Sequence, residues 1–303
     1  MRYIKKDYEF KEMIMKNLLN LLLLFSLFGG FWSCSEDEAA NALPVENEYK
    51  LTNQRYGNND RNIMDVYLPA NRTENTPFLL IIHGGGWVEG DKSIFTSMQQ
   101  LLLENNIASA SMNYRFVSES VNYKDLMQGV GDAIDYCVEY ADAWTTRKNK
   151  FAIFGHSAGA HMAMLYAYRF DRNKISAVIE AAGPTNFYDT GLLDVAGWVS
   201  FLPTIEKLAD AKYVQGQPLN NNFKAISPLW NVKNVPTLMV QGTGDIIVWN
   251  NQAQQLDAKM AELGYTKELY SLEGADHNFS NITTEKRNEM NSKVMEWIKR
   301  YSN

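Results

Sequence analysis

The feature that most constrains the fold is an alternation of short β-rich runs with longer helical patterns, from about Tyr49 to the end of the 303-residue chain. Such an alternation is typical of a mostly parallel sheet covered by helices. The expected strands are Tyr49–Tyr56, Asn62–Leu68, Phe78–Ile82, Ile107–Asn113, Phe151–Phe154, Ala177–Ala181, Thr237–Gln241 and Glu268–Leu272. The expected helices are Ser93–Asn105, Lys124–Asp142, Ala158–Phe170, Asn250–Leu263 and Thr284–Tyr301. The sequence therefore predicts one α/β domain over residues 49–303, with the first two strands as an antiparallel lead-in.

Residues 184–230 interrupt this alternation. They contain glycine, proline and aromatic residues but no run that reads as a strand. A segment of this length without strands is typical of an insertion that covers a site. We therefore expect a short cap at about residues 184–230.

The first 33 residues have the layout of an export signal. Leu18–Trp32 is almost entirely apolar, follows Lys16, and is short for a membrane span. The order of basic residue, apolar stretch and Ser33-Cys34 resembles a bacterial lipoprotein signal, although Phe31 and Trp32 are bulkier than usual there. The resemblance implies that residues 1–33 are removed, that Cys34 is lipidated and that residues 34–48 form a linker. The alternative is a signal with an incidental cysteine.

The expected location follows from this signal. A lipid anchor on Cys34 would hold the protein on a membrane, stably if two or more chains are attached. Ser35–Glu38 resembles the acidic tag that directs some Gram-negative lipoproteins to the outer cell surface, and its alternative is a solvated linker. We expect an exported protein, as a bacterial outer-membrane or cell-surface lipoprotein or otherwise in the periplasm.

Charge and cysteine content exclude other classes. The chain carries a formal net charge of −6, and basic residues outnumber acidic ones in its first 33 residues, so the body is more acidic than the whole. An acidic body without clusters of Lys or Arg argues against nucleic acid as a partner. The 2 cysteines, Cys34 and Cys137, are too few for a disulfide framework. Cys137 lies in a helical pattern, where a buried reduced thiol is expected.

The motif most informative about chemistry is Gly155-His156-Ser157-Ala158-Gly159, which follows an apolar run and opens a helical pattern. A serine at a sharp strand-to-helix corner needs small residues two positions before and two positions after it, because the backbone there is strained and crowded. The corner presents the hydroxyl of Ser157 at a helix N-terminus, where the amide of Ala158 can donate to a developing oxyanion. The alternative is a turn of small residues without chemistry.

A glycine-rich loop, His83-Gly84-Gly85-Gly86-Trp87, follows the expected strand Phe78–Ile82. Glycines let backbone amides approach a substrate oxygen, so the amides of Gly85 and Gly86 are candidates for an oxyanion hole together with that of Ala158. The alternative is a phosphate-binding turn. No Lys-Ser/Thr pair follows the glycines and no Gly-x-Gly-x-x-Gly frame is present, which disfavours a nucleotide site.

A serine nucleophile needs a base, and the chain has only 4 histidines. One belongs to the glycine loop and two flank Ser157, which leaves His277 after the last expected strand. A carboxylate that orients this base is expected between the serine and the histidine in the sequence. Asp245, which follows the strand Thr237–Gln241, meets this requirement. Asp245 would orient His277 and stabilise its imidazolium form. The alternatives are a helix-capping role for Asp245, and Asp276 as the partner of His277.

These motifs together resemble the α/β-hydrolase superfamily, and within it the esterases and lipases with an HGGGW oxyanion loop. The resemblance covers roughly Tyr49–Asn303 and rests on His83–Trp87, Asn113–Arg115, Gly155–His161, Gly242–Asp245 and Gly274–Phe279, in this order. It implies an α/β-hydrolase fold, with a mostly parallel eight-stranded sheet flanked by helices and a short cap insertion. It also implies a Ser157-His277-Asp245 triad, an acyl-enzyme, and no metal or organic cofactor.

The expected activity is that of a secreted or surface-anchored serine carboxylesterase acting on small acyl esters, which include acetyl or aryl esters on glycans. Gly155–His161 is also similar to kynurenine formamidases, so an arylformamidase is the first alternative. The second alternative is a protein with a hydrolase fold that binds its ligand without hydrolysing it. A peptidase of the prolyl-oligopeptidase type is disfavoured. The aromatic residues Trp87, Tyr114 and Trp249 are expected in the substrate pocket, and His161 is expected to be structural. Further aromatic candidates for the pocket, with core packing as the alternative, are Phe187, Tyr188, Trp198 and Phe201.

Overall fold

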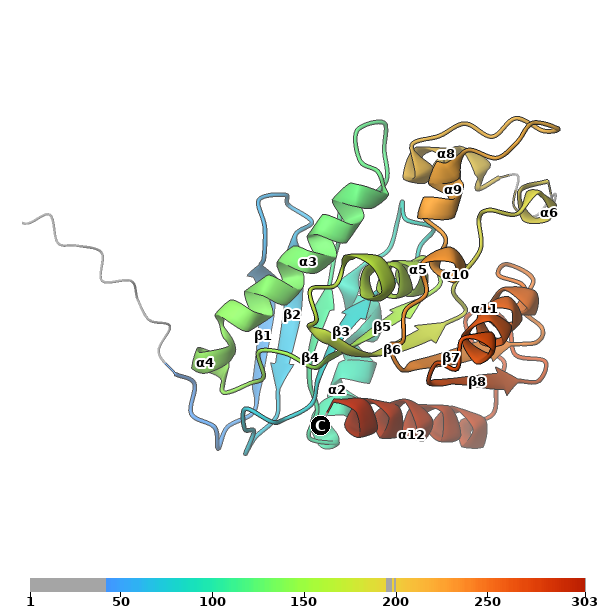
Figure 1. The fold of residues 1–303 in the computed structure, drawn as a ribbon. Coiled ribbons are helices and arrows are strands. Elements are labelled where there is room, and N and C mark those ends of the chain that lie inside the picture. The colour runs from blue at the N-terminus through green and yellow to red at the C-terminus, as the bar shows by residue number, and fades with distance from the viewer. Residues whose placement is uncertain (1–41, 195–197, 199, 303) are drawn as a thin grey trace, which may run out of the picture. The chain divides into compact units, whose positions relative to one another are not determined.

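A computed structural model describes residues 42–194, 198 and 200–302 (Figure 1). Within these residues, eight strands form one sheet in the order β1-β2-β4-β3-β5-β6-β7-β8. The strands from β3 to β8 pair in parallel, whereas β1 pairs antiparallel with β2, and β2 antiparallel with β4. The bounds are β1 Tyr49–Arg55, β2 Ile63–Leu68, β3 Phe78–Ile82, β4 Ala108–Met112, β5 Phe151–His156, β6 Ile175–Ala181, β7 Thr237–Gly242 and β8 Lys267–Leu272. The predicted fold class is confirmed, including the antiparallel lead-in.

Helices cover both faces of the sheet because its central strands are apolar on both sides (Figure 1). In β3, Phe78, Leu80 and Ile82 join one hydrophobic cluster, and Leu79 and Ile81 join another. The first cluster contains side chains from α3 (Tyr123–Glu139), α5 (Ala158–Leu165) and α11 (Asn250–Glu262). The second contains side chains from α2 (Thr96–Glu104) and α12 (Thr284–Tyr301).

The helices begin and end close to the expected residues, with differences at three places. A 3-10 turn, η1 (Lys92–Phe95), precedes α2, and a π-helical turn, η2 (Tyr166–Phe170), follows α5. The expected helix Lys124–Asp142 is divided into α3 and the short α4 (Ala141–Trp144). At the start of α3, Asn122 and Asp125 form a capping box, which satisfies two backbone N–H groups at that end.

The segment between β6 and β7 contains four short helices with defined bounds, α6 Thr190–Leu193, α8 Leu202–Ala209, α9 Asn221–Ala225 and α10 Pro228–Asn231. Its described residues contain no strand. These helices lie in the segment, at about residues 184–230, that the sequence predicts to be an inserted cap. Phe187, Ile205 and Phe223 belong to the same hydrophobic cluster as α5, which attaches the cap to the core of the domain.

Part of the segment that the sequence assigns to a linker is bound to the domain. The buried guanidinium of Arg72 donates to the carbonyls of Leu43 and Asn47, each at 2.9 Å, and Nε donates to the carbonyl of Trp144. Residues 42–48 therefore belong to the compact unit. The expected signal at residues 1–33 and the lipid site Cys34 lie outside the described residues. Within the described part of the chain, no helix is long and apolar enough to cross a membrane.

Glu180, in β6, is a fully buried carboxyl group. Its Oε2 accepts a hydrogen bond from the amide of Gly183 at 2.9 Å, and its Oε1 has no partner among the described residues. Burial raises the pKa of Glu180 to about 8, because one hydrogen bond does not replace the hydration that the carboxylate loses. Glu180 is therefore protonated at neutral pH, and this neutral acid holds the turn that follows β6.

The substitution Glu180→Gln should weaken the pH dependence of stability. The carboxyl ionises near pH 4.5 when unfolded and near pH 8 when folded. Between these values only the folded chain binds the proton, so the free energy of unfolding falls with rising pH, by at most about 1.4 kcal/mol per unit. Urea unfolding between about pH 5 and pH 8 measures the slope, which should be shallower for Glu180→Gln. The control Glu74→Gln changes an exposed carboxyl and should follow the wild type; identical slopes for wild type and Glu180→Gln would contradict the assignment.

Candidate active site

Ser157 occupies a strained corner between β5 and α5. Its backbone has φ 55° and ψ −121°, a conformation that non-glycine residues rarely adopt. A Cβ on Gly155 would lie 2.1 Å from the carbonyl oxygen of Gly159, and a Cβ on Gly159 would lie 2.2 Å from that of Ile82. Both glycines are therefore required by space, as the sequence pattern predicts. The corner exposes the hydroxyl of Ser157 to a cavity.

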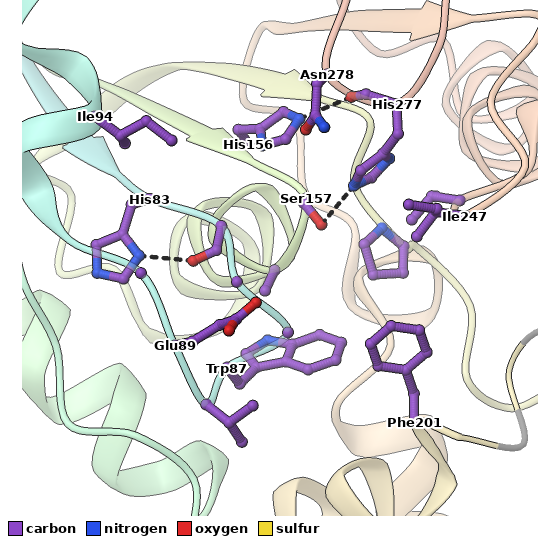
Figure 2. Close-up of a pocket in the computed structure, with 18 of the residues that line it drawn as sticks. His83, Trp87, Glu89, Ile94, His156, Ser157, Phe201, Ile247, His277 and Asn278 are labelled. Carbon is purple, nitrogen blue, oxygen red and sulfur yellow. Dashed lines mark hydrogen bonds between the residues drawn. The ribbon is translucent and has the colours of Figure 1, made fainter.

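The three side chains selected from the sequence form one chain of hydrogen bonds, of which Figure 2 shows the bond between Ser157 and His277. Ser157 Oγ lies 2.9 Å from His277 Nε2, and His277 Nδ1 lies 2.8 Å from Asp245 Oδ2. A carboxylate only accepts, so Nδ1 carries the proton that His277 donates to Asp245. This tautomer leaves Nε2 free to accept the proton of Ser157.

Asp245 is held by further hydrogen bonds. The amides of Ile247 and Val248 donate to its Oδ1 at 2.8 and 2.9 Å, and the side-chain amide of Gln241 donates to Oδ2 at 3.2 Å. These contacts keep an ionised carboxylate in a buried position, where it would otherwise be costly. The orientation of Asp245 toward His277 is therefore set by its own loop.

The two alternatives for the acid do not match the geometry. The N-cap of α11 is Trp249, and no side chain caps that helix, so Asp245 does not serve as its cap. Asp276 instead accepts hydrogen bonds from Ser280 and Asn278 within its own turn. The hydrogen bonds from Ser280 lower the pKa of Asp276. Asp276 therefore shapes the turn that carries His277.

The glycine loop presents unpaired amides beside Ser157. Gly85 and Gly86 have φ of 106° and 55°, a region that favours glycine. Across the described residues, no acceptor pairs with the amides of Gly85, Gly86 or Ala158. All three residues line the same cavity as Ser157. Ala158 is also the first residue of α5, where the helix dipole adds partial positive charge.

His83 and Arg61 fix this loop from behind. Arg61 Nη2 lies 3.3 Å from His83 Nε2 and donates to the carbonyl of Gly90 at 3.0 Å, so Nε2 of His83 is the acceptor. His83 Nδ1 then donates to the carbonyl of Gly84 at 2.6 Å (Figure 2). Burial, together with a smaller effect of the charge of Arg61, lowers the pKa of His83 to about 4, so this histidine is neutral.

Tyr114 supports the loop and does not line the pocket, so the expectation for this residue is wrong. Its side chain is fully buried and stacks on His83 with ring centroids 4.4 Å apart. Its hydroxyl donates to the carbonyls of His83 and Gly84 at 3.1 and 3.2 Å. The neighbouring Asn113 accepts from the amide of Lys92 at 2.7 Å, which ties the end of β4 to the loop after the glycines.

The two remaining histidines are also structural. His156 Nε2 donates to the carbonyl of His277 at 2.9 Å and so positions the loop of that residue (Figure 2). His161 Nδ1 accepts from Trp87 Nε1 at 3.1 Å, and its Nε2 donates to the carbonyl of Ile226 in the cap at 2.8 Å. Burial lowers the pKa of His156, and it lowers that of His161 to about 4.

A cavity of about 490 Å³ opens above Ser157, a size that suits a small molecule. Trp87 lines it as expected. Trp249 does not line it, so that expectation is wrong: Ile247 and Val248, just before Trp249, face the cavity instead. Trp198 and Phe201, two of the further aromatic candidates, also line it. The sequence offered no periodic or motif signal for the remaining walls, which are Val88, Glu89, Gly90, Asp91, Ile94, Phe95, Pro184 and Asn278. Among the described residues there is no cluster of three or more His, Cys, Asp or Glu that could hold a metal ion.

The sheet topology, the Ser157 corner and the hydrogen-bonded Ser-His-Asp chain define an α/β hydrolase. The chain belongs to the BD-FAE family, whose profile matches residues 64–260, and it is an esterase-like member of the α/β hydrolases.

Proteins with similar sequences include a formamidase and several probable methylesterases. The chain is 25% identical over 231 residues to the kynurenine formamidase of Drosophila melanogaster, covering 74% of this chain and 73% of that protein. It is 33% identical over 111 residues to a probable isoprenylcysteine alpha-carbonyl methylesterase of Arabidopsis thaliana, covering 36% of this chain and 22% of that protein. The matched part spans about a quarter of the length of such methylesterases.

Solved structures show the same fold. Esterase B of Lactobacillus rhamnosis aligns with a TM-score of 0.70 at 19% identity, covering 87% of this chain and 90% of that chain. A truncated carbohydrate esterase from gut microbiota aligns with a TM-score of 0.66 at 18% identity, covering 85% of this chain and 99% of that chain. At these identities the likeness concerns the fold alone.

Proposed function

We propose that this protein is a serine carboxylesterase that hydrolyses small acyl esters through Ser157, His277 and Asp245. The observation that carries the proposal is the continuous hydrogen-bonded chain from Ser157 Oγ through His277 to Asp245. The Ser157 end of this chain lies in a cavity, beside three unpaired amides. A nucleophile, its base and a set of donors for negative charge are the parts that acyl transfer requires.

The reaction follows from this arrangement. His277 Nε2 removes the proton of Ser157 as Oγ attacks the ester carbonyl, and Asp245 stabilises the imidazolium that forms. The amides of Gly85, Gly86 and Ala158 bind the oxyanion of the tetrahedral intermediate. The imidazolium then protonates the leaving alcohol, which leaves an acyl group on Ser157. Water activated by His277 repeats the sequence and releases the carboxylic acid.

The substitution Ser157→Ala should abolish both ester hydrolysis and covalent labelling by a fluorophosphonate probe. Loss of a serine nucleophile in such a triad lowers kcat by roughly 10⁶-fold. Turnover of 4-nitrophenyl acetate and gel detection of the labelled protein measure the two effects, with circular dichroism as the control for folding. Retained labelling of the variant would place the nucleophile at another residue, and absence of turnover in the wild type would favour a fold that only binds its ligand.

Within the small acyl esters, we propose that the substrate is an acetyl or aryl ester, including one carried on a glycan. The aromatic walls at Trp198 and Phe201 support an aryl or otherwise apolar group in the cavity. The likeness to the fly kynurenine formamidase over 74% of the chain supports an arylformamidase as the second candidate.

A substrate panel separates these candidates. It comprises acetyl, butyryl, octanoyl and feruloyl esters, acetylated oligosaccharides and N-formylkynurenine. We expect kcat/KM for the best ester to exceed that for N-formylkynurenine by at least about tenfold, a difference of about 1.4 kcal/mol in transition-state binding. A preference for the formamide would assign the second function, and Ser157→Ala supplies the background rate for each compound.

We also propose that the protein is exported and anchored through a lipid on Cys34, on the basis of the N-terminal sequence. Expression of the full-length chain in a Gram-negative host with an alkyne fatty acid should label the wild type and place it in the membrane fraction. The variant Cys34→Ser should lose the label and leave that fraction, whereas Cys137→Ser, which changes a buried thiol, should behave as the wild type. Equal labelling of all three proteins would contradict lipidation at Cys34.

A further inference from the structure

A carboxylate lies in the wall of the cavity beside the oxyanion loop. Glu89 lines the cavity, and its amide donates to the carbonyl of Gly85 at 3.0 Å, which folds residue 89 back onto that glycine. A Cβ placed on Gly85 would lie 3.1 Å from Cγ of Glu89, so the side chain runs directly past the loop that offers the amides. Figure 2 shows Glu89 between His83 and Trp87, with its carboxylate on the side of Ser157.

The other charges near the cavity are balanced by neighbours. Asp91 accepts from Asn113 Nδ2 at 2.7 Å and has a favourable Coulomb interaction with Arg61. Lys92 forms an ion pair with Asp65 at 2.7 Å. The carboxylate of Asp245 is paired with His277, as described above.

Glu89 has no such balance. Within the part of the chain that the structure describes, no cation and no hydrogen-bond donor contacts its carboxylate, and no Lys or Arg lines the cavity. The facing walls are apolar or aromatic and are formed by Trp198, Phe201, Ile247 and Val248, which cannot solvate a charged ligand. The cavity therefore holds one unpaired negative charge, and apart from His277 and the amides that bind the oxyanion in the proposed reaction its walls offer no group that would compensate a second.

We propose that Glu89 determines substrate specificity by charge: the site takes esters whose group inside the cavity is uncharged or cationic, and it rejects those that carry a carboxylate. The proposal rests on the proposed ester hydrolysis and adds the class of substrate. The physical cause is Coulomb repulsion between Glu89 and an anionic ligand in a cavity that excludes part of the solvent. Because Glu89 is itself exposed, we expect a moderate effect that salt screens.

Two matched pairs of esters test the proposal without assuming which end of the substrate lies near Glu89. The acyl group differs in charge between 4-nitrophenyl butyrate and 4-nitrophenyl hemisuccinate. The leaving group differs in charge between methyl 4-acetoxybenzoate and 4-acetoxybenzoate. At an ionic strength of about 20 mM, Glu89→Gln should raise kcat/KM for the anionic member of at least one pair by about three- to tenfold. It should leave the neutral members within about twofold.

The control variant is Glu74→Gln, which removes the same charge from an exposed residue before β3, at the end of the sheet opposite the cavity. Glu74→Gln should not change the ratio of kcat/KM for the neutral ester to kcat/KM for the anionic ester in either pair. This control distinguishes the effect of the charge at Glu89 from the effect of the net charge of −6 on the whole protein. Raising the ionic strength to about 500 mM should remove most of the difference between wild type and Glu89→Gln.

The remaining outcomes are distinguishable. Equal ratios in wild type and Glu89→Gln would overturn the role of Glu89 while ester hydrolysis still stands. A parallel loss of kcat/KM for neutral and anionic esters would assign Glu89 to the shape of the loop and would also overturn selection by charge. If the wild type hydrolyses none of the four esters, the proposed function itself fails.

Discussion

The close packing of Gly155, Gly159 and the end of β3 is the constraint on which the rest of the site depends. A Cβ on Gly155 would meet the carbonyl of Gly159, and a Cβ on Gly159 would meet the carbonyl of Ile82. Ile82 directly precedes His83, so the same contact fixes both the corner at Ser157 and the start of the glycine loop. Ser157 and the amides of Gly85 and Gly86 are therefore held in register by backbone atoms, whose positions vary little.

Three of the four histidines then make this arrangement rigid. His83, His156 and His161 each donate to a backbone carbonyl, of Gly84, His277 and Ile226 respectively. Burial lowers the pKa of all three, so they remain neutral and keep one nitrogen as a donor and the other as an acceptor. These histidines link the glycine loop, the corner at Ser157, the loop of His277 and the cap. Only His277 is placed to exchange a proton with Ser157.

The parts of the site that the sequence predicts well are those with a local cause. A glycine two residues from Ser157 is required by the corner itself, and the strands that precede Ser157, Asp245 and His277 are visible as apolar runs. The walls of the cavity have no such cause. Tyr114 is an aromatic residue near a motif, yet it packs beneath the loop, and Trp249 is displaced from the cavity by Ile247 and Val248. The direction of each of these side chains depends on turns whose conformation is set by distant contacts.

The sequence by itself determined the eight strands, the parallel sheet with its antiparallel lead-in, and the three side chains at the strand ends, because periodicity and turn residues act over a few neighbours. The tertiary structure alone decided which walls surround Ser157 and which charges there are balanced. Glu89 shows the difference. In the sequence it is one exposed carboxyl among many, and only the fold of the loop onto Gly85 places its uncompensated charge beside the site. Charge compensation is a property of neighbours in space, and the neighbours that could supply it here come from separate strands, loops and the cap.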